Sequence, residues 1–200
     1  MRRNAISRIV DVVVAALALT VTSPLLAGSV IAIRLESKGP AFYRQRRVGR
    51  NGEPFELLKL RTMVSGAEAM GAGIYVLEGD ARITRVGWAL RRFSLDELPN
   101  LVNVLRGDMA IVGPRPTIQE QVDRYTERQL RRLEVKPGIT GWAQVNGRAT
   151  LPWPARIELD VWYVDNRSLL LDLKILLKTV RMLATGHGLY SEDPYQGWKG

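Results

Sequence analysis

The chain has 200 residues, 46% of them hydrophobic and 24% charged, which is enough apolar chain for one folded domain and excludes a disordered protein. It has no cysteine and one histidine, His187, which excludes disulfides, cysteine nucleophiles and cysteine-zinc sites and nearly excludes histidine-based triads. The net charge of +9 indicates an anionic partner: nucleic acid, anionic lipid or a phosphorylated substrate. Any metal would need oxygen ligands, as Mg²⁺ and Mn²⁺ do.

Residues 12–33 carry no charge and are long enough to cross a membrane as a helix. Hydropathy alone favours a spanning helix. However, Pro24 follows Ser23 in mid-run, where proline interrupts the helical hydrogen bonds, and basic residues flank both ends, which assigns both to the cytoplasm. A broken helix that enters one leaflet and returns satisfies both observations. The sequence therefore predicts a re-entrant membrane helix over residues 1–36 and a cytosolic catalytic domain over residues 37–200.

The cytosolic part is predicted to be α+β and mainly helical. Two strands, at residues 42–48 and 55–61, are expected to form a hairpin, because Asn51-Gly52 between them is a strong turn signal. Residues 66–79 and 135–148 have the glycine content of loops. Thr117 and Glu120 predict a capping box. Helices are expected over residues 84–93, 96–105, 117–132, 154–164 and 169–184.

The last of these helices has leucines on one face and basic residues on the other. Its apolar face could pack against the domain or lie on an anionic membrane surface, and both alternatives use the same residues. The predicted fold is thus a re-entrant membrane helix followed by a small cytoplasmic domain with a β-hairpin and amphipathic interfacial helices.

Two adjacent carboxylates, Asp96 and Glu97, fall at a predicted helix start. Pro99 supports that position, because a proline fits best in a first helical turn. Ser94 and Glu97 also match a capping box, which would hold the pair in place. The helix dipole would favour the ionised form of Asp96. With arginines before and after it in the sequence, an ionised Asp96 predicts an anionic substrate and a carboxylate nucleophile.

Seven motifs in chain order resemble the bacterial sugar transferases, the monotopic phosphoglycosyl transferases that act as polyprenyl-phosphate sugar-1-phosphate transferases. The resemblance covers nearly the whole chain, and the motifs together are highly specific although each alone is modest. They are FYRQRRVG at 42–49, KLRTM at 59–63, SLDELP at 94–99, NVLRGDM at 103–109, VGPRP at 112–116, KPGITGWAQVNGR at 136–148 and LDVWY at 159–163.

The resemblance implies transfer of a phosphosugar from a UDP-sugar to undecaprenyl phosphate, with UMP released, at the cytoplasmic face of the bacterial membrane. Asp96 would be the nucleophile and form an aspartyl phosphosugar. Cations must neutralise the diphosphate for this attack. Magnesium is the expected cofactor, with manganese as an alternative; Glu97 is the first choice of ligand and Asp96 is close enough to share the metal.

Three basic residues are predicted to supply further positive charge. Arg91 resembles the phosphate-binding arginine of the family. Lys59 and Arg61, two apart on a predicted strand, would point to the same face of the hairpin. The alternative for the last two is an ordinary solvated strand edge.

Pro114-Arg115-Pro116 predicts a rigid loop that holds Arg115 in a fixed geometry, and by resemblance this loop contacts the nucleotide. The alternative is a simple turn before the next helix. Arg148 and Asp160 resemble a further pair near the site, although a structural ion pair would have the same sequence pattern.

Two rival functions remain at this point. In the first, Asp96 and Glu97 only hold metal and the lipid phosphate attacks the donor directly. In the second, the protein is a non-enzymatic basic adaptor at a membrane surface; no nucleic-acid motif supports a nucleic-acid partner. The sequence leaves open the sugar, the pathway and the oligomeric state, with a homodimer among the alternatives.

Overall fold

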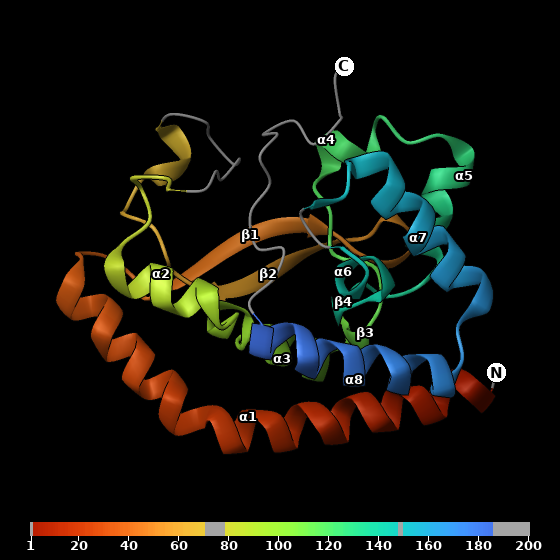
Figure 1. The fold of residues 1–200 in the computed structure, drawn as a ribbon, viewed down its shortest axis with the longest axis horizontal. Helices are drawn as coiled ribbons and strands as arrows, with labels where there is room; N and C mark the ends of the chain where they lie inside the picture. Colours follow the sequence, from red (N-terminus) through yellow and green to blue (C-terminus); the bar gives the residue numbers. More distant parts are fainter. Residues whose placement is uncertain (1, 71–78, 148–149, 186–200) are drawn as a thin grey trace.

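The computed structural model describes residues 2–70, 79–147 and 150–185 of an α+β protein that is mainly helical. The first helix, α1 (Arg2–Glu36), and the last, α8 (Leu169–Thr185), run side by side along one edge of the molecule (Figure 1). The hairpin of β1 (Phe42–Val48) and β2 (Pro54–Leu60) lies above them. Helix α7 (Trp153–Asn166) and the segments before it cover the end opposite α2 (Arg85–Arg92). This confirms the coarse fold class.

Helix α1 is one continuous helix with Pro24 inside it, and Figure 1 shows that it bends in its second half. Pro24 has no N–H to offer the carbonyl four residues earlier, that of Thr20. The Ser23 hydroxyl donates to that same carbonyl at 2.8 Å. The Ser-Pro pair therefore bends the helix while keeping its backbone satisfied, so the expected break takes the form of a bend.

Both ends of α1 are fixed to the rest of the protein. Arg8 donates to two carbonyls in the last turn of α3 (Asn100–Arg106), at 2.5 and 2.9 Å, and Asp11 accepts from the amide of Ile111. At the other end, the Glu36 carboxylate accepts from the first two amides of α2 at 2.8 and 2.9 Å. Helix α1 ends at the residue where the predicted membrane segment ends; the division into two domains stays a prediction.

The predicted hairpin is confirmed. Strands β1 (Phe42–Val48) and β2 (Pro54–Leu60) pair antiparallel, and Asn51 and Gly52 in the turn have positive φ angles of 57° and 83°. The region expected to be a loop over residues 135–148 instead contains β4 (Gly138–Thr140) and α6 (Trp142–Val145), and β4 pairs in parallel with β3 (Ala110–Val112). A Cβ on Gly138 would lie 2.1 Å from the Gly113 nitrogen, so glycine permits this close approach.

The helix expected over residues 96–105 is divided. A single 3-10 turn, η3 (Leu95–Glu97), precedes α3. The predicted capping box at Ser94 is wrong, because Ser94 has a left-handed backbone (φ 54°) and its side chain makes no capping hydrogen bond. An N-cap needs an extended backbone to aim its side chain at the turn. Thr84 meets this condition and caps α2.

The helix expected over residues 117–132 is also divided. It consists of α4 (Gln119–Val122), α5 (Glu127–Leu130) and the 3-10 helix η4 (Arg131–Glu134). The predicted capping box at Thr117 is wrong, since this side chain is buried and bonds to the side chains of Gln121 and Tyr125. The capping box of this region is formed by Thr126 and Gln129.

Helices α7 and α8 confirm the predictions for residues 154–164 and 169–184. Beside them, Asn103 of α3 ties the hairpin to the helices, because it accepts from the Leu58 amide and donates to the Glu56 carbonyl. Among the described residues, α1 is long and apolar enough to cross a membrane, by length and composition. Large hydrophobic side chains are exposed along both α1 and α8, for example Leu17, Val21, Leu170 and Leu177. This surface indicates membrane association.

Candidate active site

The acidic pair lies in η3, between α2 and α3, and faces β2. Glu97 Oε1 accepts from Lys59 Nζ at 2.9 Å and from Arg115 Nη2 at 2.8 Å. Lys59 comes from β2 and Arg115 from the loop after β3. The Glu97 side chain is only 14% exposed. Three segments that are distant in the sequence thus meet at one carboxylate; the substrate-binding roles of Lys59 and Arg115 and the metal-binding role of Glu97 stay predictions.

Two cations fix the charge state of Glu97. Burial by itself would raise the pKa of this carboxyl, but the charges and hydrogen bonds of Arg115 and Lys59 outweigh it and hold the pKa far below the usual range. The same contact with Glu97 raises the pKa of Arg115. Glu97 is therefore an anion that its protein partners have already neutralised.

Asp96 is placed differently. To the extent that the structure describes its neighbours, its carboxylate accepts no hydrogen bond and has no cation within 4.0 Å. Burial raises its pKa, an effect opposed by the nearby charges of Lys59, Arg91 and Arg115. The expectation that a helix dipole favours ionised Asp96 is wrong, because η3 is one turn only and burial outweighs the favourable charges.

Arg91 is held on the same side of the site by α2. Its Nε donates to the Thr62 hydroxyl at 2.7 Å. Helix α2 can approach this close because residue 87 is glycine: a Cβ there would lie 2.0 Å from the Thr62 carbonyl oxygen. Arg91 also lowers the cost of ionising Asp96. The structure thus brings Arg91 to the acidic turn.

Arg61 lies apart from this group. Its guanidinium donates to the carbonyls of Lys38 and Ser37 at 2.6 and 2.8 Å, and to the Ser37 hydroxyl at 3.0 Å. Strand β2 ends at Leu60, so the alternation that would align Arg61 with Lys59 does not continue to this residue. In the structure Arg61 secures the segment that leaves α1, and its role in substrate binding stays a prediction.

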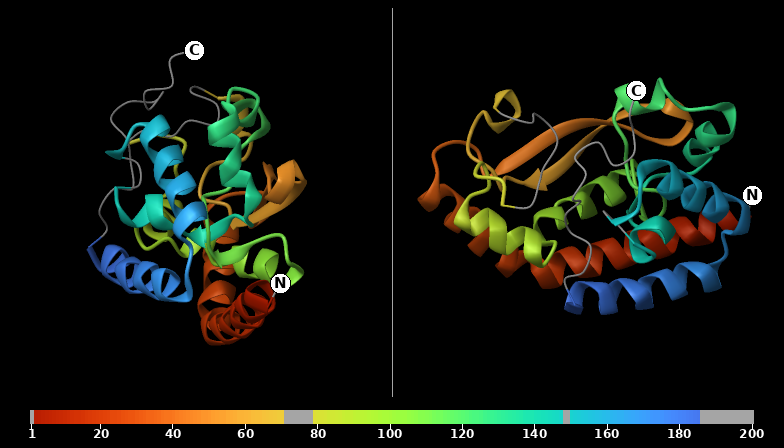
Figure 2. Two further views of the ribbon diagram at one scale, coloured as in Figure 1. Left: turned by 90° about the vertical axis from the view of Figure 1, so that its right-hand side faces the viewer. Right: turned by 45° about the horizontal axis from the view of Figure 1, so that its top comes forward.

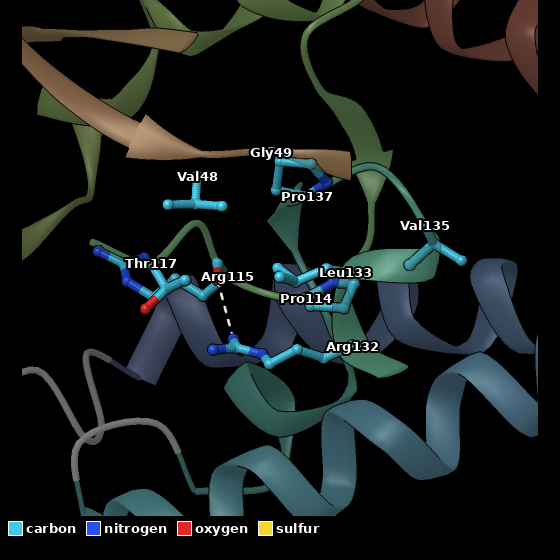
Figure 3. A pocket seen from close by; sticks show the side chains of 9 residues that line it. All are labelled: Val48, Gly49, Pro114, Arg115, Thr117, Arg132, Leu133, Val135 and Pro137. Atoms are coloured by element: carbon cyan, nitrogen blue, oxygen red, sulfur yellow. Dashed lines mark hydrogen bonds between the residues drawn. The ribbon is translucent and has the colours of Figure 1, made fainter. Parts of the chain in front are cut away.

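The Pro114-Arg115-Pro116 loop is held through its backbone. The Arg115 carbonyl accepts from Arg132 at 3.0 Å, and the Pro114 carbonyl accepts from the amide of Gly138 at 2.9 Å. Figure 3 shows Arg132 beneath this loop, in a small pocket that Val48, Gly49, Thr117, Leu133, Val135 and Pro137 also line. The loop thus has the fixed geometry that the two prolines predict.

Asp160 forms a buried ion pair with Arg132, a partner that the sequence did not predict. The two side chains are 2.6 Å apart and are 3% and 2% exposed. Arg132 also donates to the Tyr125 hydroxyl and lies over the ring of Trp153, 5.6 Å from its centroid. Arg148 lies outside the described residues. Asp160 therefore acts through Arg132 on the carbonyl of the Arg115 loop.

A magnesium ion fits the donor set at the acidic turn. Asp96 and Glu97 supply hard, anionic oxygens, and Asp96 has no competing partner in the described part of the chain. No group of three or more acidic or histidine side chains gathers there or elsewhere in residues 2–70, 79–147 and 150–185. Magnesium tolerates this, because it keeps water and substrate oxygens in its coordination shell.

Two further arginines at the site, Arg132 and Arg47, are not among the residues predicted from the sequence. Arg47 lies in the FYRQRRVG motif, which was a usable signal, and its Nη1 is 3.4 Å from the Pro116 carbonyl. Arg132 is one of several arginines in a helical segment, and nothing in its local pattern distinguishes it from the half-buried Arg131 or the exposed Arg128.

Comparison with protein families matches residues 2–186 to the family described as bacterial sugar transferase. The chain belongs to the bacterial sugar transferase family. The match covers every element of the site above, including η3, β2 and the Arg115 loop. Membership in a family of transferases favours an enzyme over the non-enzymatic adaptor.

Three relatives illustrate the range of the family. One, named as the uncharacterised sugar transferase EpsL of Bacillus subtilis, is 46% identical over 184 residues, 92% of this chain and 90% of that protein. The UDP-glucose:undecaprenyl-phosphate glucose-1-phosphate transferase of Caulobacter vibrioides is 45% identical over 191 residues, 92% of this chain and 71% of that protein. The UDP-N-acetylgalactosamine-undecaprenyl-phosphate N-acetylgalactosaminephosphotransferase of Aeromonas hydrophila is 42% identical over 189 residues; they make up 92% of this chain but only 44% of that protein.

Proposed function

We propose that this protein is a phosphoglycosyl transferase that moves a phosphosugar from a UDP-sugar to undecaprenyl phosphate and releases UMP. The names of the relatives support the class of both substrates. The product, undecaprenyl-diphosphate-sugar, would start the membrane stage of a bacterial glycoconjugate. Relatives with different printed sugars match at similar identity, so the class of reaction rather than the sugar is proposed.

The reaction proceeds in two displacements at one phosphorus. An oxygen of the Asp96 carboxylate attacks the sugar-linked phosphorus, a P–O bond to UMP breaks, and UMP leaves with the electron pair. A phosphate oxygen of the lipid then attacks the same phosphorus and frees Asp96. Dividing a difficult transfer in this way is covalent catalysis. Lys59, Arg91 and Arg115 would offset the negative charge of the diphosphate during both steps.

The observation that carries the proposal is the contrast between two neighbouring carboxylates. Glu97 is held by Lys59 and Arg115, which leaves it oriented and ionised. Asp96 stands among the same charges without a direct partner in the described residues. An oxygen without a hydrogen bond is the better nucleophile, because no bond to the protein has to break before it attacks. Asp96 is therefore proposed as the nucleophile and Glu97 as a positioning and metal-binding residue.

Magnesium, or manganese in its place, would be held by Asp96 and Glu97, with the remaining ligands from substrate oxygens and water. The ion would neutralise part of the diphosphate charge. Because Lys59 and Arg115 already pair with Glu97, the ion would add to the positive charge that they and Arg91 bring to the diphosphate.

The rival mechanism is direct attack of the lipid phosphate on the donor, and a mass measurement separates the two. The purified protein is incubated with a UDP-sugar and Mg²⁺ without lipid, and its peptides are weighed. We expect one phosphosugar on the peptide that contains Asp96, and no adduct or turnover in Asp96→Asn, because an amide is a far weaker nucleophile. The exposed Glu120→Gln serves as the matched control. Substantial turnover of Asp96→Asn would establish direct attack.

We also propose that α1 is re-entrant and that the protein is monotopic at the cytoplasmic face. Arg8 and Asp11 near one end, and Glu36 at the other, bond to the same compact domain, which supports having both ends on one side of the membrane. The apolar surface shared by α1 and α8 would then lie in one leaflet, with an anionic lipid surface favoured by the net charge of +9. A homodimer stays a prediction.

A further inference from the structure

Arg47 lies on the same face of the hairpin as Lys59. In the antiparallel register Tyr43 is opposite Lys59, and Arg47 is opposite Phe55. Side chains opposite each other, and those two residues apart along a strand, share a face. Tyr43, Gln45 and Arg47 are accordingly half-buried, whereas the residues between them are exposed. The hairpin thus directs Lys59 and Arg47 toward the same side, the side of the acidic turn.

Arg47, at the end of strand β1, reaches the Arg115 loop. The amide of Val48 donates to the Thr117 carbonyl at 2.8 Å, and Arg47 Nη1 is 3.4 Å from the Pro116 carbonyl. Strand β1 is therefore attached to the segment that carries Arg115. Val48 and Thr117 also line the small pocket of Figure 3, which Arg115 borders. Arg47 therefore contacts the loop that carries Arg115, at its Pro116 carbonyl.

Arg47 has no acidic partner among the residues that the structure describes. Its Nε and Nη2 donate to Gln45 Oε1 at 3.0 and 2.5 Å, a neutral amide on its own strand. Of the nearby acids, Glu97 is held by the two cations described above, and Glu68 accepts from the Tyr43 hydroxyl. The guanidinium is thus oriented by an amide rather than neutralised by a carboxylate.

A half-buried cation beside another cation is unfavourable in the free protein. Burial, followed by the repulsion from Arg115, lowers the pKa of Arg47 to about 10. Gln45 nevertheless holds the guanidinium in place, so the fold keeps an oriented charge that no carboxylate in the described part of the site contacts directly. Such an arrangement is expected where an anion binds, because the ligand then supplies the missing counter-charge.

We propose that Arg47 binds a phosphate group of the substrate, on the grounds that it shares a hairpin face with Lys59, contacts the Arg115 loop and lacks a carboxylate partner in the described residues. The proposal rests on the proposed function, because both substrates of that reaction carry phosphate. The planar guanidinium suits a phosphate, with which it can form two parallel hydrogen bonds. Both the donor diphosphate and the lipid phosphate have this chemistry, and the measurements below distinguish them.

Binding of UDP to the full-length protein in lipid nanodiscs, with no lipid acceptor added, tests this by titration calorimetry. We expect Arg47→Gln to weaken UDP binding by about tenfold or more, as the loss of a charged hydrogen bond does, and Arg47→Lys to recover part of the loss. The matched control is Arg46→Gln, on the exposed face of the same strand, which should bind UDP as the wild type does.

A second measurement separates ligand binding from a structural role. The melting temperature of unliganded Arg47→Gln should equal or exceed that of the wild type, because an unpaired half-buried charge has been removed. Unchanged UDP affinity in Arg47→Gln, or a melting temperature well below that of the wild type with the UDP affinity restored on cooling, would overturn the proposal.

The steady-state constants identify the source of the phosphate and keep this test apart from the general one. A raised KM for the UDP-sugar alone supports the donor diphosphate, and a raised KM for the lipid phosphate alone would move the contact to the acceptor. If the wild type binds UDP but transfers no sugar phosphate, the proposed reaction fails while the Arg47 comparison still stands. If the wild type binds no UDP, both proposals fall.

Discussion

Replacing Asp160 by leucine would leave the Arg132 guanidinium buried without a counter-charge. The pair is 2.6 Å apart, with both side chains 3% exposed or less. Removal of one partner from a buried ion pair costs about 3–5 kcal/mol. A protein of this size loses about 2–4 °C of melting temperature per kcal/mol. Asp160→Leu should therefore lower the melting temperature by about 6–20 °C.

Tryptophan fluorescence is a suitable assay, because Arg132 lies over the Trp153 ring. The control is Glu158→Leu on the same helix, whose ion pair with Arg128 is 3.0 Å long but exposed; it should cost no more than about 1 kcal/mol. The double variant Arg132→Met, Asp160→Leu should melt above Asp160→Leu alone, since no buried charge remains unpaired. A loss below about 3 °C for Asp160→Leu, or a double variant less stable than the single one, would refute the reasoning.

Three further outcomes are expected. Burial raises the pKa of Asp96 above 3.8, and only the ionised carboxylate attacks. The rate of adduct formation should therefore fall as the pH is lowered through this raised pKa. A single-turnover pH profile in which the rate falls only at or below pH 3.8 would contradict this. Glu97→Gln should lose most turnover and need more Mg²⁺, and EDTA should stop the wild type; full activity in EDTA would exclude a metal role. Since the chain has no cysteine, single cysteines at Asn4 and Ser37 should both resist an impermeant thiol reagent in intact cells, and labelling at position 4 alone would show a spanning helix.

The sequence predicted those elements whose signal repeats over many residues. The apolar run of α1, the alternation and turn of the hairpin, and the amphipathic pattern of α8 each draw on a whole segment. The errors fall on short signals that tertiary contacts override. Thr117 matches a capping pattern, but its hydroxyl is buried against Tyr125 instead. Strands of three residues, such as β3 and β4, offer too little alternation to be predicted at all.

At the site, too, residues in specific motifs were predicted, whereas contacts that depend on tertiary packing were not. Asp96, Glu97 and Arg115 belong to specific motifs, and the structure brings Arg115 to Glu97. The partner of Asp160 could not be read from the sequence, because an ion pair between residues far apart depends on how α7 packs on η4. Arg61 shows the limit of strand alternation: two residues after Lys59, it already follows the end of the strand and bonds to the chain leaving α1.

The membrane helix belongs to the scaffold of the active site. Helix α2 has eight residues, too few to be stable alone. Glu36 of α1 accepts from its first two amides, and Thr84 accepts from the third, that of Gly87. The acidic turn follows α2 directly, so the position of Asp96 depends on where α1 ends. Ile33 of α1 also packs in the same buried cluster as residues of β2 and α2. Figure 2 shows the same arrangement from two further sides, with α1 running beneath the hairpin and α2. If the acceptor is a lipid, as proposed, this connection would let the apolar helix fix the position of the proposed nucleophile, Asp96, relative to the membrane.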